Sequence, residues 1–301
     1  MVVTEDKKTG LSVLTVTLDG GFDVGKTFDC GQCFRFDPVE NSSHEIEYSG
    51  VAFGRLVSFG QDGNTLYIYN STAEDYRDLW RHYLGLDVDY SDIRTSLLES
   101  CDSAQFASAV RHGEGIRILN QDPYETVISF IISQNNNIPR IKQIIERLCT
   151  LCGDKIEVPE GMESHLSGKS SLCTFPTAER LYSLGVDGLF AAKTGFRAKY
   201  IYDALGKILT GQIDPALPMG LDSTAEGMEY LCEIKGVGPK VASCILLFSC
   251  ERYDAFPVDV WIKKAMAKYF PEKDFSFEFF GAYAGIAQQY LFYYERYLGG
   301  E

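Results

Sequence analysis

The chain has 301 residues and a formal net charge of −14, with 45% hydrophobic and 23% charged residues. This composition supports a sizeable folded core and excludes an intrinsically disordered protein, and at roughly 100–200 residues per domain the length corresponds to one large domain or two to three smaller ones. The acidic balance argues against broad, non-specific coating of nucleic acid, but it leaves room for DNA binding through one local face.

Two features of the sequence predict where the protein works. The first residues lack the charged-then-apolar layout of a secretory signal, and no apolar run reaches the roughly 18 residues that a membrane helix needs. We therefore expect a soluble, intracellular protein with no membrane partner, in the cytoplasm or nucleoid of a bacterium or in the nucleus of a eukaryote.

The chain has nine cysteines, and an odd number speaks against a disulfide framework. Two pairs have CxxC spacing, Cys30 with Cys33 and Cys149 with Cys152. Zinc-binding pairs usually lie within about 20 residues of each other, and these two pairs are much further apart. We expect buried structural thiols, with a zinc site as the weaker alternative.

The first third of the chain is predicted to be rich in strands. Residues 11–18, 55–59 and 65–69 are rich in β-branched and aromatic side chains, and residues 61–64 (QDGN) form a turn between the last two. This pattern predicts an antiparallel sheet with one buried face.

From about residue 72 the pattern becomes helical. Residues 124–134 are predicted to form a core helix, and Asn137 is an N-cap for the next helix, with Pro139 in its first turn. Residues 153–175 are expected to form a long connection. Further helices are predicted at 177–184, 196–209, 224–233, 239–250, 260–270 and 278–296. The expected fold class is α+β.

The most informative stretch is residues 231–244 (LCEIKGVGPKVASC). One helix ends there, Gly236 and Gly238 allow a tight turn around Val237, and Pro239 opens the next helix. The glycines expose backbone N–H groups beside the positive end of that helix, which suits a DNA phosphate. A plain helical corner is the structural alternative, but the whole string matches the helix-hairpin-helix signature.

Asp259 follows this hairpin within residues 255–261 (AFPVDVW). By itself Asp259 is an N-cap of the next helix. Together with the hairpin and Lys240, it resembles the helix-hairpin-helix Gly/Pro-Asp (HhH-GPD) superfamily of DNA glycosylases. No cysteine follows Cys250, so the iron–sulfur loop of the endonuclease III and adenine-glycosylase branches is absent from this sequence.

Other stretches resemble the 8-oxoguanine DNA glycosylase/lyase branch of that superfamily. They are residues 28–36 (FDCGQCFRF), 133–140 (SQNNNIPR), 195–200 (GFRAKY) and 283–292 (YAGIAQQYLF). The resemblance implies an N-terminal β-rich domain over residues 1–115 and a helical HhH-GPD catalytic region over residues 116–301, with its hairpin at 231–250.

The resemblance implies an enzyme that flips 8-oxoguanine out of the duplex opposite cytosine, with glycosylase and AP lyase activities in base excision repair. Lys240 would attack C1′ and form a Schiff base, after which β-elimination would nick the strand. Asp259 would stabilise positive charge on the sugar and orient or deprotonate Lys240. Desolvation and a helix N-terminus both disfavour an ammonium group, which makes this role of Lys240 chemically credible.

The resemblance also assigns residues to the flipped base. The backbone carbonyl of Gly31 would accept a hydrogen bond from N7–H, which 8-oxoguanine carries and guanine lacks. Gln288 would read the Watson–Crick edge of the base. Phe292 and Cys244 would enclose its ring on both sides, although plain core packing is an equal alternative for these two.

A second group would contact the cytosine left behind. By resemblance, Asn135 would fill the vacated space and Phe196 would wedge beside it. Arg140 and Arg197 would donate to the acceptor atoms of the cytosine. The structural alternative is a capped helix start and ordinary surface arginines.

No cofactor is required for this chemistry, and no iron–sulfur cluster is expected. The resemblance implies a monovalent cation at the hairpin, held by the backbone carbonyls of Cys232, Ile234 and Val237. The implied partner is double-stranded DNA containing 8-oxoguanine, bound by a monomer.

Two local features modify this picture. Trp261 stands where the family has a histidine that contacts phosphate, and an indole can donate one hydrogen bond but cannot become cationic. Residues 231–268 carry six basic and four acidic side chains. We therefore expect one modest basic face, with weak non-specific DNA affinity and steep salt sensitivity.

Three other hypotheses stay open at this point. The chain could be another glycosylase of the superfamily, acting on alkylated bases or oxidised pyrimidines. It could be a non-catalytic DNA-binding module, which leaves the pairing of Lys240 with Asp259 unexplained. It could also be a structural α+β protein with no DNA role, which only the acidic pI of about 4.8 favours.

Overall fold

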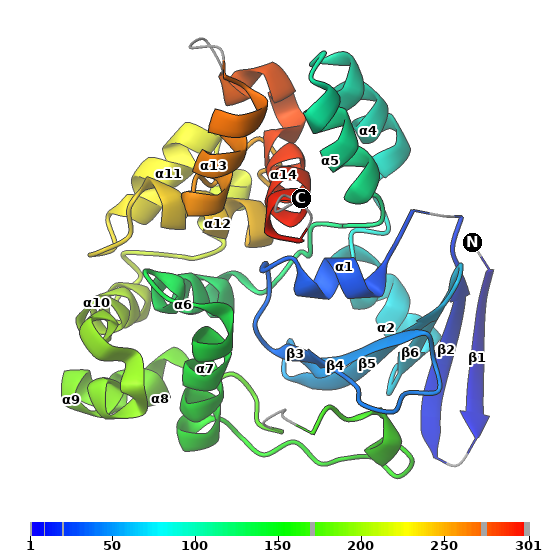
Figure 1. The fold of residues 1–301 in the computed structure, drawn as a ribbon. Coiled ribbons are helices and arrows are strands. Elements are labelled where there is room, and N and C mark those ends of the chain that lie inside the picture. The colour runs from blue at the N-terminus through cyan, green and yellow to red at the C-terminus, as the bar shows by residue number, and fades with distance from the viewer. Residues whose placement is uncertain (1, 9, 20, 169–171, 272–275, 298–301) are drawn as a thin grey trace.

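The structure is a computed structural model and describes residues 2–8, 10–19, 21–168, 172–271 and 276–297. A six-stranded sheet forms one part of the molecule and helices form most of the rest (Figure 1). The α+β fold class is therefore confirmed. Within the described residues, no helix has the length and hydropathy to cross a membrane.

The sheet is antiparallel, with strand order β1-β2-β6-β5-β4-β3. Its strands are β1 (Val2–Lys8), β2 (Leu11–Thr17), β3 (Phe36–Pro38), β4 (Ile46–Ala52), β5 (Arg55–Asp62) and β6 (Thr65–Tyr69). The three predicted strands correspond to β2, β5 and β6, and the predicted turn joins β5 to β6. The sequence patterns do not reveal β1, β3 and β4.

Both faces of the sheet are covered, which corrects the prediction of a single buried face. Phe28 of α1 (Val24–Asp29) packs on one face, together with Trp80 and Tyr83. These two residues belong to a helical segment that consists of α2 (Ala73–Asp75), a π-helical turn (Tyr76–Trp80) and α3 (Arg81–Tyr83). On the opposite face, Met162 of the long connection packs with Leu56 and Tyr69. The prediction is wrong because the connection returns to the sheet after about 100 intervening residues, and no local pattern signals that contact.

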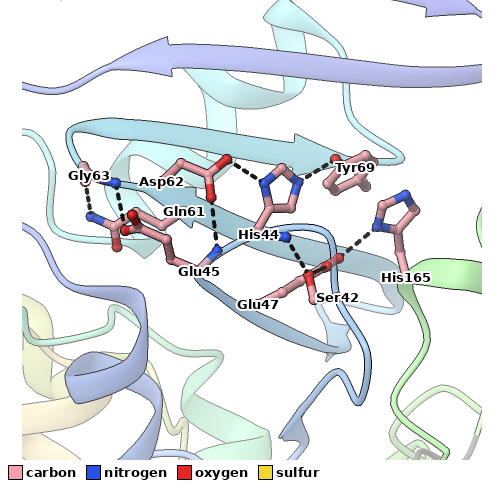
Figure 2. A network of polar contacts seen from close by, with 9 residues as sticks. All are labelled: Ser42, His44, Glu45, Glu47, Gln61, Asp62, Gly63, Tyr69 and His165. Atoms are coloured by element: carbon pink, nitrogen blue, oxygen red, sulfur yellow. Dashed lines mark hydrogen bonds and ion pairs between the residues drawn. The ribbon is translucent and has the colours of Figure 1, made fainter.

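A buried polar network ties the same connection to the sheet (Figure 2). The Nδ1 atom of His165 lies 2.8 Å from Oε1 of Glu47, whose side chain is fully buried in β4. Glu47 also accepts hydrogen bonds from the hydroxyls of Ser42 and Ser58. The ring of His165 stacks on Tyr69 of β6, with centroids 3.6 Å apart. The connection is therefore a packed part of the fold.

The helical body follows the predicted order, and each predicted helix has a counterpart. Its α-helices are α4 (Tyr90–Glu99), α5 (Ala104–His112), α6 (Pro123–Ser133), α7 (Ile138–Cys152), α8 (Ala178–Ser183), α9 (Gly185–Leu189), α10 (Ala198–Leu209), α11 (Thr224–Cys232), α12 (Pro239–Ser249), α13 (Val260–Tyr269) and α14 (Ala284–Tyr297). The helix predicted at 278–296 is divided into a 3₁₀ segment (Phe277–Tyr283) and α14, and Gly281, with a φ of 54°, interrupts the 3₁₀ segment. Asn137 caps α7 as predicted, accepting from the backbone N–H of Arg140 at 3.0 Å.

The two predicted domains share their cores across the boundary at residue 115. Phe106 of α5 and Ile93 of α4 belong to the same hydrophobic cluster as Tyr290 of α14. Figure 1 shows α4 and α5 beside α14 and away from the sheet. In packing terms these two helices belong to the helical body, although they precede the boundary in the chain.

Candidate active site

The hairpin connects α11 to α12 and has the geometry that its glycines predict. Gly236 has a φ of 82°, in the left-handed region, and a Cβ atom there would lie 2.5 Å from the ring of Tyr200. The backbone N–H of Val237 donates to the carbonyl of Ile234 at 3.0 Å. Gly238 caps α12 without a side-chain hydrogen bond, so the first N–H groups of the helix are left for another acceptor.

Lys240 is the second residue of α12 and lies where the hairpin meets a cavity. Its ammonium nitrogen is 5.7 Å from the ring centroid of Phe130 of α6. Burial raises the pKa of the Cys244 thiol, and the nearby Lys240 partly offsets this effect. Lys240 is therefore half-buried, lies beside an aromatic ring and lines the cavity.

Asp259 caps α13, the next helix along the chain. Its Oδ1 atom accepts hydrogen bonds from the backbone N–H groups of Trp261 at 2.9 Å and of Ile262 at 2.8 Å. These two bonds hold the carboxylate at the positive end of the helix. Asp259 also borders the same cavity as Lys240. The capping role and the predicted catalytic role are therefore compatible in one side chain.

The cavity has a volume of about 340 Å³, within the range of roughly 300–1,000 Å³ that is usual for ligand sites. All six residues predicted for catalysis and base recognition line it, namely Gly31, Lys240, Cys244, Asp259, Gln288 and Phe292. They come from the loop after α1, from α12, from the start of α13 and from α14. The fold thus brings together segments separated by up to about 260 residues.

Gly31 forms the edge of the cavity next to Phe292. Its φ is 78°, and a Cβ atom on it would lie 3.4 Å from Cε1 of Phe292. The side chain of Gln32 anchors this loop: its Nε2 donates to the carbonyls of Thr27 and Arg117, each at 2.8 Å. Gln32 is fully buried. The position of the Gly31 backbone is therefore fixed by a buried amide in the next residue.

Gln288 and Gln289 are consecutive residues of α14, and both line the cavity. Each is only 3% exposed. Nε2 of Gln289 donates to Oε1 of Gln288 at 2.9 Å. The predicted base-reading amide is therefore paired with a second amide.

The residues predicted to face the cytosine form a separate group outside this cavity. Asn135 has a φ of 47° in the turn between α6 and α7, and Arg140 and Phe196 are exposed. The guanidinium group of Arg197 lies 4.4 Å from the ring centroid of Phe196. The structure therefore brings these four predicted residues close together, with Asn135, Arg140 and Phe196 exposed.

Arg197 differs from its neighbours because it is only 3% exposed. Its Nε donates to the carbonyl of Gln134 at 2.8 Å, and one of its terminal nitrogens donates to the carbonyl of Asn135 at 2.9 Å. Burial, and then the charge of Arg140, lower the pKa of Arg197. In this structure Arg197 supports the backbone of the Asn135 turn.

The cysteines are free thiols in the described structure, and most are buried. Burial raises the pKa of Cys33 and of Cys149 to about 12. Within the described part of the chain, no three His, Cys, Asp or Glu side chains form a group that could hold a metal ion. The burial of Cys30, Cys33 and Cys149 is compatible with a structural role of these thiols.

Three residues of the site were not predicted from the sequence. Phe130 packs between Phe34 and Phe248, with ring centroids 5.5 and 5.4 Å away, and the three rings line the cavity. Gln32 and Gln289 are the other two. The apolar residues of α6 and a glutamine beside Gly31 are visible in the sequence, but only the three-dimensional packing shows that Gln32 is buried and that Phe130 reaches the cavity.

A hairpin that presents a lysine and a capping aspartate to one cavity is the arrangement that defines the HhH-GPD class. Residues 128–276 match the family model described as HhH-GPD superfamily base excision DNA repair protein. Residues 15–127 match the model described as 8-oxoguanine DNA glycosylase, N-terminal domain. The chain belongs to the 8-oxoguanine DNA glycosylase family of this superfamily.

Named relatives agree with this assignment. The chain is 31% identical to N-glycosylase/DNA lyase OGG1 of Arabidopsis thaliana over 81% of its own length and 65% of that protein. It is 30% identical to a probable N-glycosylase/DNA lyase of Methanothermobacter thermautotrophicus, covering 73% of this chain and 75% of that one. The chain thus spans just under two thirds of the Arabidopsis relative, and it spans 48% of the N-glycosylase/DNA lyase of Saccharomyces cerevisiae.

A solved structure is similar over nearly the whole chain. It is the 8-oxoguanine glycosylase/lyase of Clostridium acetobutylicum in complex with double-stranded DNA containing cytosine opposite 8-oxoguanine. The identity is 37% and the TM-score 0.85, with 98% of each chain covered. A 3-methyladenine DNA glycosylase of Archaeoglobus fulgidus, at 18% identity and a TM-score of 0.71, shares the fold.

Proposed function

We propose that the protein is a bifunctional DNA glycosylase and AP lyase that removes 8-oxoguanine from opposite cytosine. One observation carries the proposal: Lys240 and Asp259 open onto the same cavity as Gly31 and Gln288. A nucleophile, a carboxylate and two base-reading groups therefore surround one space. The similarity to the clostridial enzyme, which binds this lesion opposite cytosine, supports the choice of substrate.

The chemical step uses Lys240 as the nucleophile. Its deprotonated Nζ forms a bond to C1′ as the bond from C1′ to the base nitrogen breaks, and the base leaves with that electron pair and takes up a proton. The sugar ring opens to give an imine between Lys240 and C1′. Loss of a C2′ proton then expels the 3′ phosphate in a β-elimination. Asp259, fixed by two backbone N–H groups, stabilises the positive charge that develops on the sugar.

Base recognition depends on the Gly31 backbone. A carbonyl attracts the N7–H of 8-oxoguanine and repels the N7 lone pair of guanine. Gln32 anchors this loop through buried hydrogen bonds. The Gly31 carbonyl is therefore already held in place before the base arrives, and binding does not have to supply the free energy for ordering it. Phe292 and Cys244 line the cavity, where they can pack on the two faces of the ring.

Recognition of the orphaned cytosine falls to the exposed group around Asn135. Arg140 is exposed and free to donate to cytosine acceptors, while Phe196 is 49% exposed and suited to wedge into the base stack. Arg197 contributes by donating a hydrogen bond to the backbone carbonyl of Asn135, which holds this turn in place. Direct contact of Arg197 with the cytosine stays a prediction.

The reaction as proposed needs no metal and no organic cofactor. A monovalent cation at the hairpin also stays a prediction. The Ile234 carbonyl accepts from Val237 and keeps a second lone pair, so it is compatible with a cation without requiring one. We also expect a monomer that acts inside the cell.

A panel of lesion-containing duplexes tests this proposal. Single-turnover release should be rapid for 8-oxoguanine opposite cytosine, slower for 8-oxoguanine opposite adenine, and absent for guanine. Faster release of 3-methyladenine or of an oxidised pyrimidine would contradict the proposed substrate. Binding without release of any base would instead identify a non-catalytic reader.

A further inference from the structure

The hydrogen bond between the amides of Gln288 and Gln289 is a feature of the cavity that the proposed mechanism does not use. Both side chains are nine-tenths buried or more and both line the cavity. Consecutive residues of a helix point about 100° apart, so neither has to contact the other. Their hydrogen bond, at 2.9 Å, is therefore a specific contact.

The Gln289 side chain has few other interactions to explain its burial. Its Oε1 atom is buried and has no hydrogen-bond partner among the described residues. An unsatisfied buried acceptor costs about 1–3 kcal/mol, and such groups in native proteins usually have a reason. The bond to Gln288 is the one that the structure shows for this side chain.

This bond determines which end of the Gln288 amide is available to a ligand. A primary amide has a carbonyl acceptor and an NH₂ donor that occupy similar volumes, so packing alone distinguishes them poorly. Gln289 donates to the carbonyl oxygen of Gln288. This bond occupies one lone pair of that oxygen and fixes which end of the amide is the carbonyl. The structure shows no hydrogen-bond partner for the NH₂ group of Gln288 among the described residues, and this group is available to a ligand.

We infer that Gln289 is a positioning residue that fixes the hydrogen-bonding polarity of Gln288 and thereby selects a guanine-type over an adenine-type base. This inference rests on the proposed function. The Watson–Crick edge of a guanine-type base carries the O6 acceptor, where an adenine-type base carries an amino donor. A Gln288 amide that presents its NH₂ group pairs with O6 and opposes the amino group.

The test compares two lesions that differ at that edge alone. 8-Oxoguanine and 8-oxoadenine share N7–H and the C8 oxygen, so the Gly31 contact is the same for both. Single-turnover release of each, opposite cytosine, is measured for the wild-type protein, for Gln289→Met and for Gln289→Glu. Methionine keeps the volume and removes the hydrogen bond. Glutamate has no donor and accepts a hydrogen bond from the NH₂ group of Gln288. The direction of the hydrogen bond is then reversed, and the carbonyl of Gln288 faces the base.

The ratio of the two rates is the decisive quantity. We expect Gln289→Met to lower the preference for 8-oxoguanine about tenfold, the value of one buried hydrogen bond, and Gln289→Glu to lower it at least as much. Gln61→Met is the matched control. It removes a buried amide that donates to the carbonyls of Phe22 and Gly63 and accepts from the N–H of Val24. Gln61 does not line the cavity, so the substitution should leave the ratio unchanged.

Outcomes for the inference and for the proposed function can be distinguished. If the wild-type protein releases no 8-oxoguanine, the proposed function fails. If it does, and the Gln289 variants keep the wild-type ratio, the inference is overturned. A uniform loss of both rates together with a lowered Tm would show that Gln289 contributes to stability only, and this result also contradicts the inference.

Discussion

At the scale of single residues, Asp259 combines a structural role with a chemical one. Its carboxylate caps α13 through two backbone N–H groups and at the same time faces the cavity of Lys240. Capping requires an oxygen acceptor, whereas stabilisation of a cationic sugar requires negative charge. The two roles can therefore be separated by substitution.

Asp259→Asn should keep the protein folded and abolish most of its activity. Asparagine is as good an N-cap as aspartate, so we expect little change in Tm. Loss of the charge should slow base release by about 100-fold or more. Asp259→Ala should lose the activity and, in addition, about 1 kcal/mol of stability. Thermal melts and single-turnover rates check both variants, and full activity of Asp259→Asn would exclude the electrostatic role.

At the scale of elements, the connection between α7 and α8 is held on the sheet by Glu47 and His165. Burial alone would raise the pKa of Glu47, but hydrogen bonds from His165, Ser42 and Ser58 more than offset it, so the pKa is lowered. A carboxylate with a folded-state pKa below its unfolded value stabilises the fold above the unfolded pKa. This stabilisation is lost as the pH falls through the folded pKa.

Glu47→Gln should therefore destabilise the protein at neutral pH, by about 1–3 kcal/mol for weakened hydrogen bonds to a charged group. It should also flatten the dependence of stability on pH below about 4.5, near the ordinary pKa of glutamate. Urea unfolding at several pH values measures both effects. Asp62→Asn, which affects the exposed carboxylate bound to His44, is the control and should have a smaller effect. Equal effects of the two variants would contradict the buried network.

The sequence predicts those features that depend on residues close together in the chain. Asn137 and Asp259 cap their helices as predicted, because a cap depends on a few neighbouring residues. By contrast, β4 was not recognised. It buries Glu47 and Ser49, and the buried glutamate is tolerated because Ser42, Ser58 and His165, the last far along the chain, bond to it. Nothing near Glu47 in the sequence announces His165 as a partner.

The same distinction holds for the site. Lys240, Asp259 and Gly31 were found because a family motif contains them, whereas their convergence on one cavity depends on the packing of α6, α12 and α14. Arg197 was predicted as a base reader, and the structure adds a role in holding the Asn135 turn. No motif in the sequence points to Gln289, because the role inferred for it depends on its hydrogen bond to Gln288, which only the structure shows.

At the scale of the whole molecule, a net charge of −14 must coexist with DNA binding. Lys264 lies 4.6 Å from the ring of Trp261, which lines the cavity, so α13 supplies a cation beside an aromatic side chain of the cavity. We expect only a few contacts with DNA phosphates to contribute to the affinity for DNA. Each of them should contribute about −0.9 to the slope of the logarithm of the binding constant against the logarithm of the salt concentration.

Lys264→Gln should weaken binding to lesion-containing and undamaged DNA alike and reduce that slope by about 1. Lys155→Gln is the matched control, because Lys155 is an exposed lysine in the connection that packs on the sheet, and it should leave the slope unchanged. Fluorescence anisotropy at several salt concentrations provides the slopes. An unchanged slope for Lys264→Gln would place the phosphate contacts elsewhere.

The central claim is that Lys240 forms a covalent imine with the sugar of an excised 8-oxoguanine, and borohydride trapping tests it most directly. The wild-type protein, incubated with a duplex carrying 8-oxoguanine opposite cytosine and reduced with borohydride, should give a stable protein–DNA adduct. Lys240→Gln should give none while still binding the lesion, and undamaged duplex should give none. An adduct that persists in Lys240→Gln, or tight lesion binding by the wild-type protein without any adduct, would contradict the account.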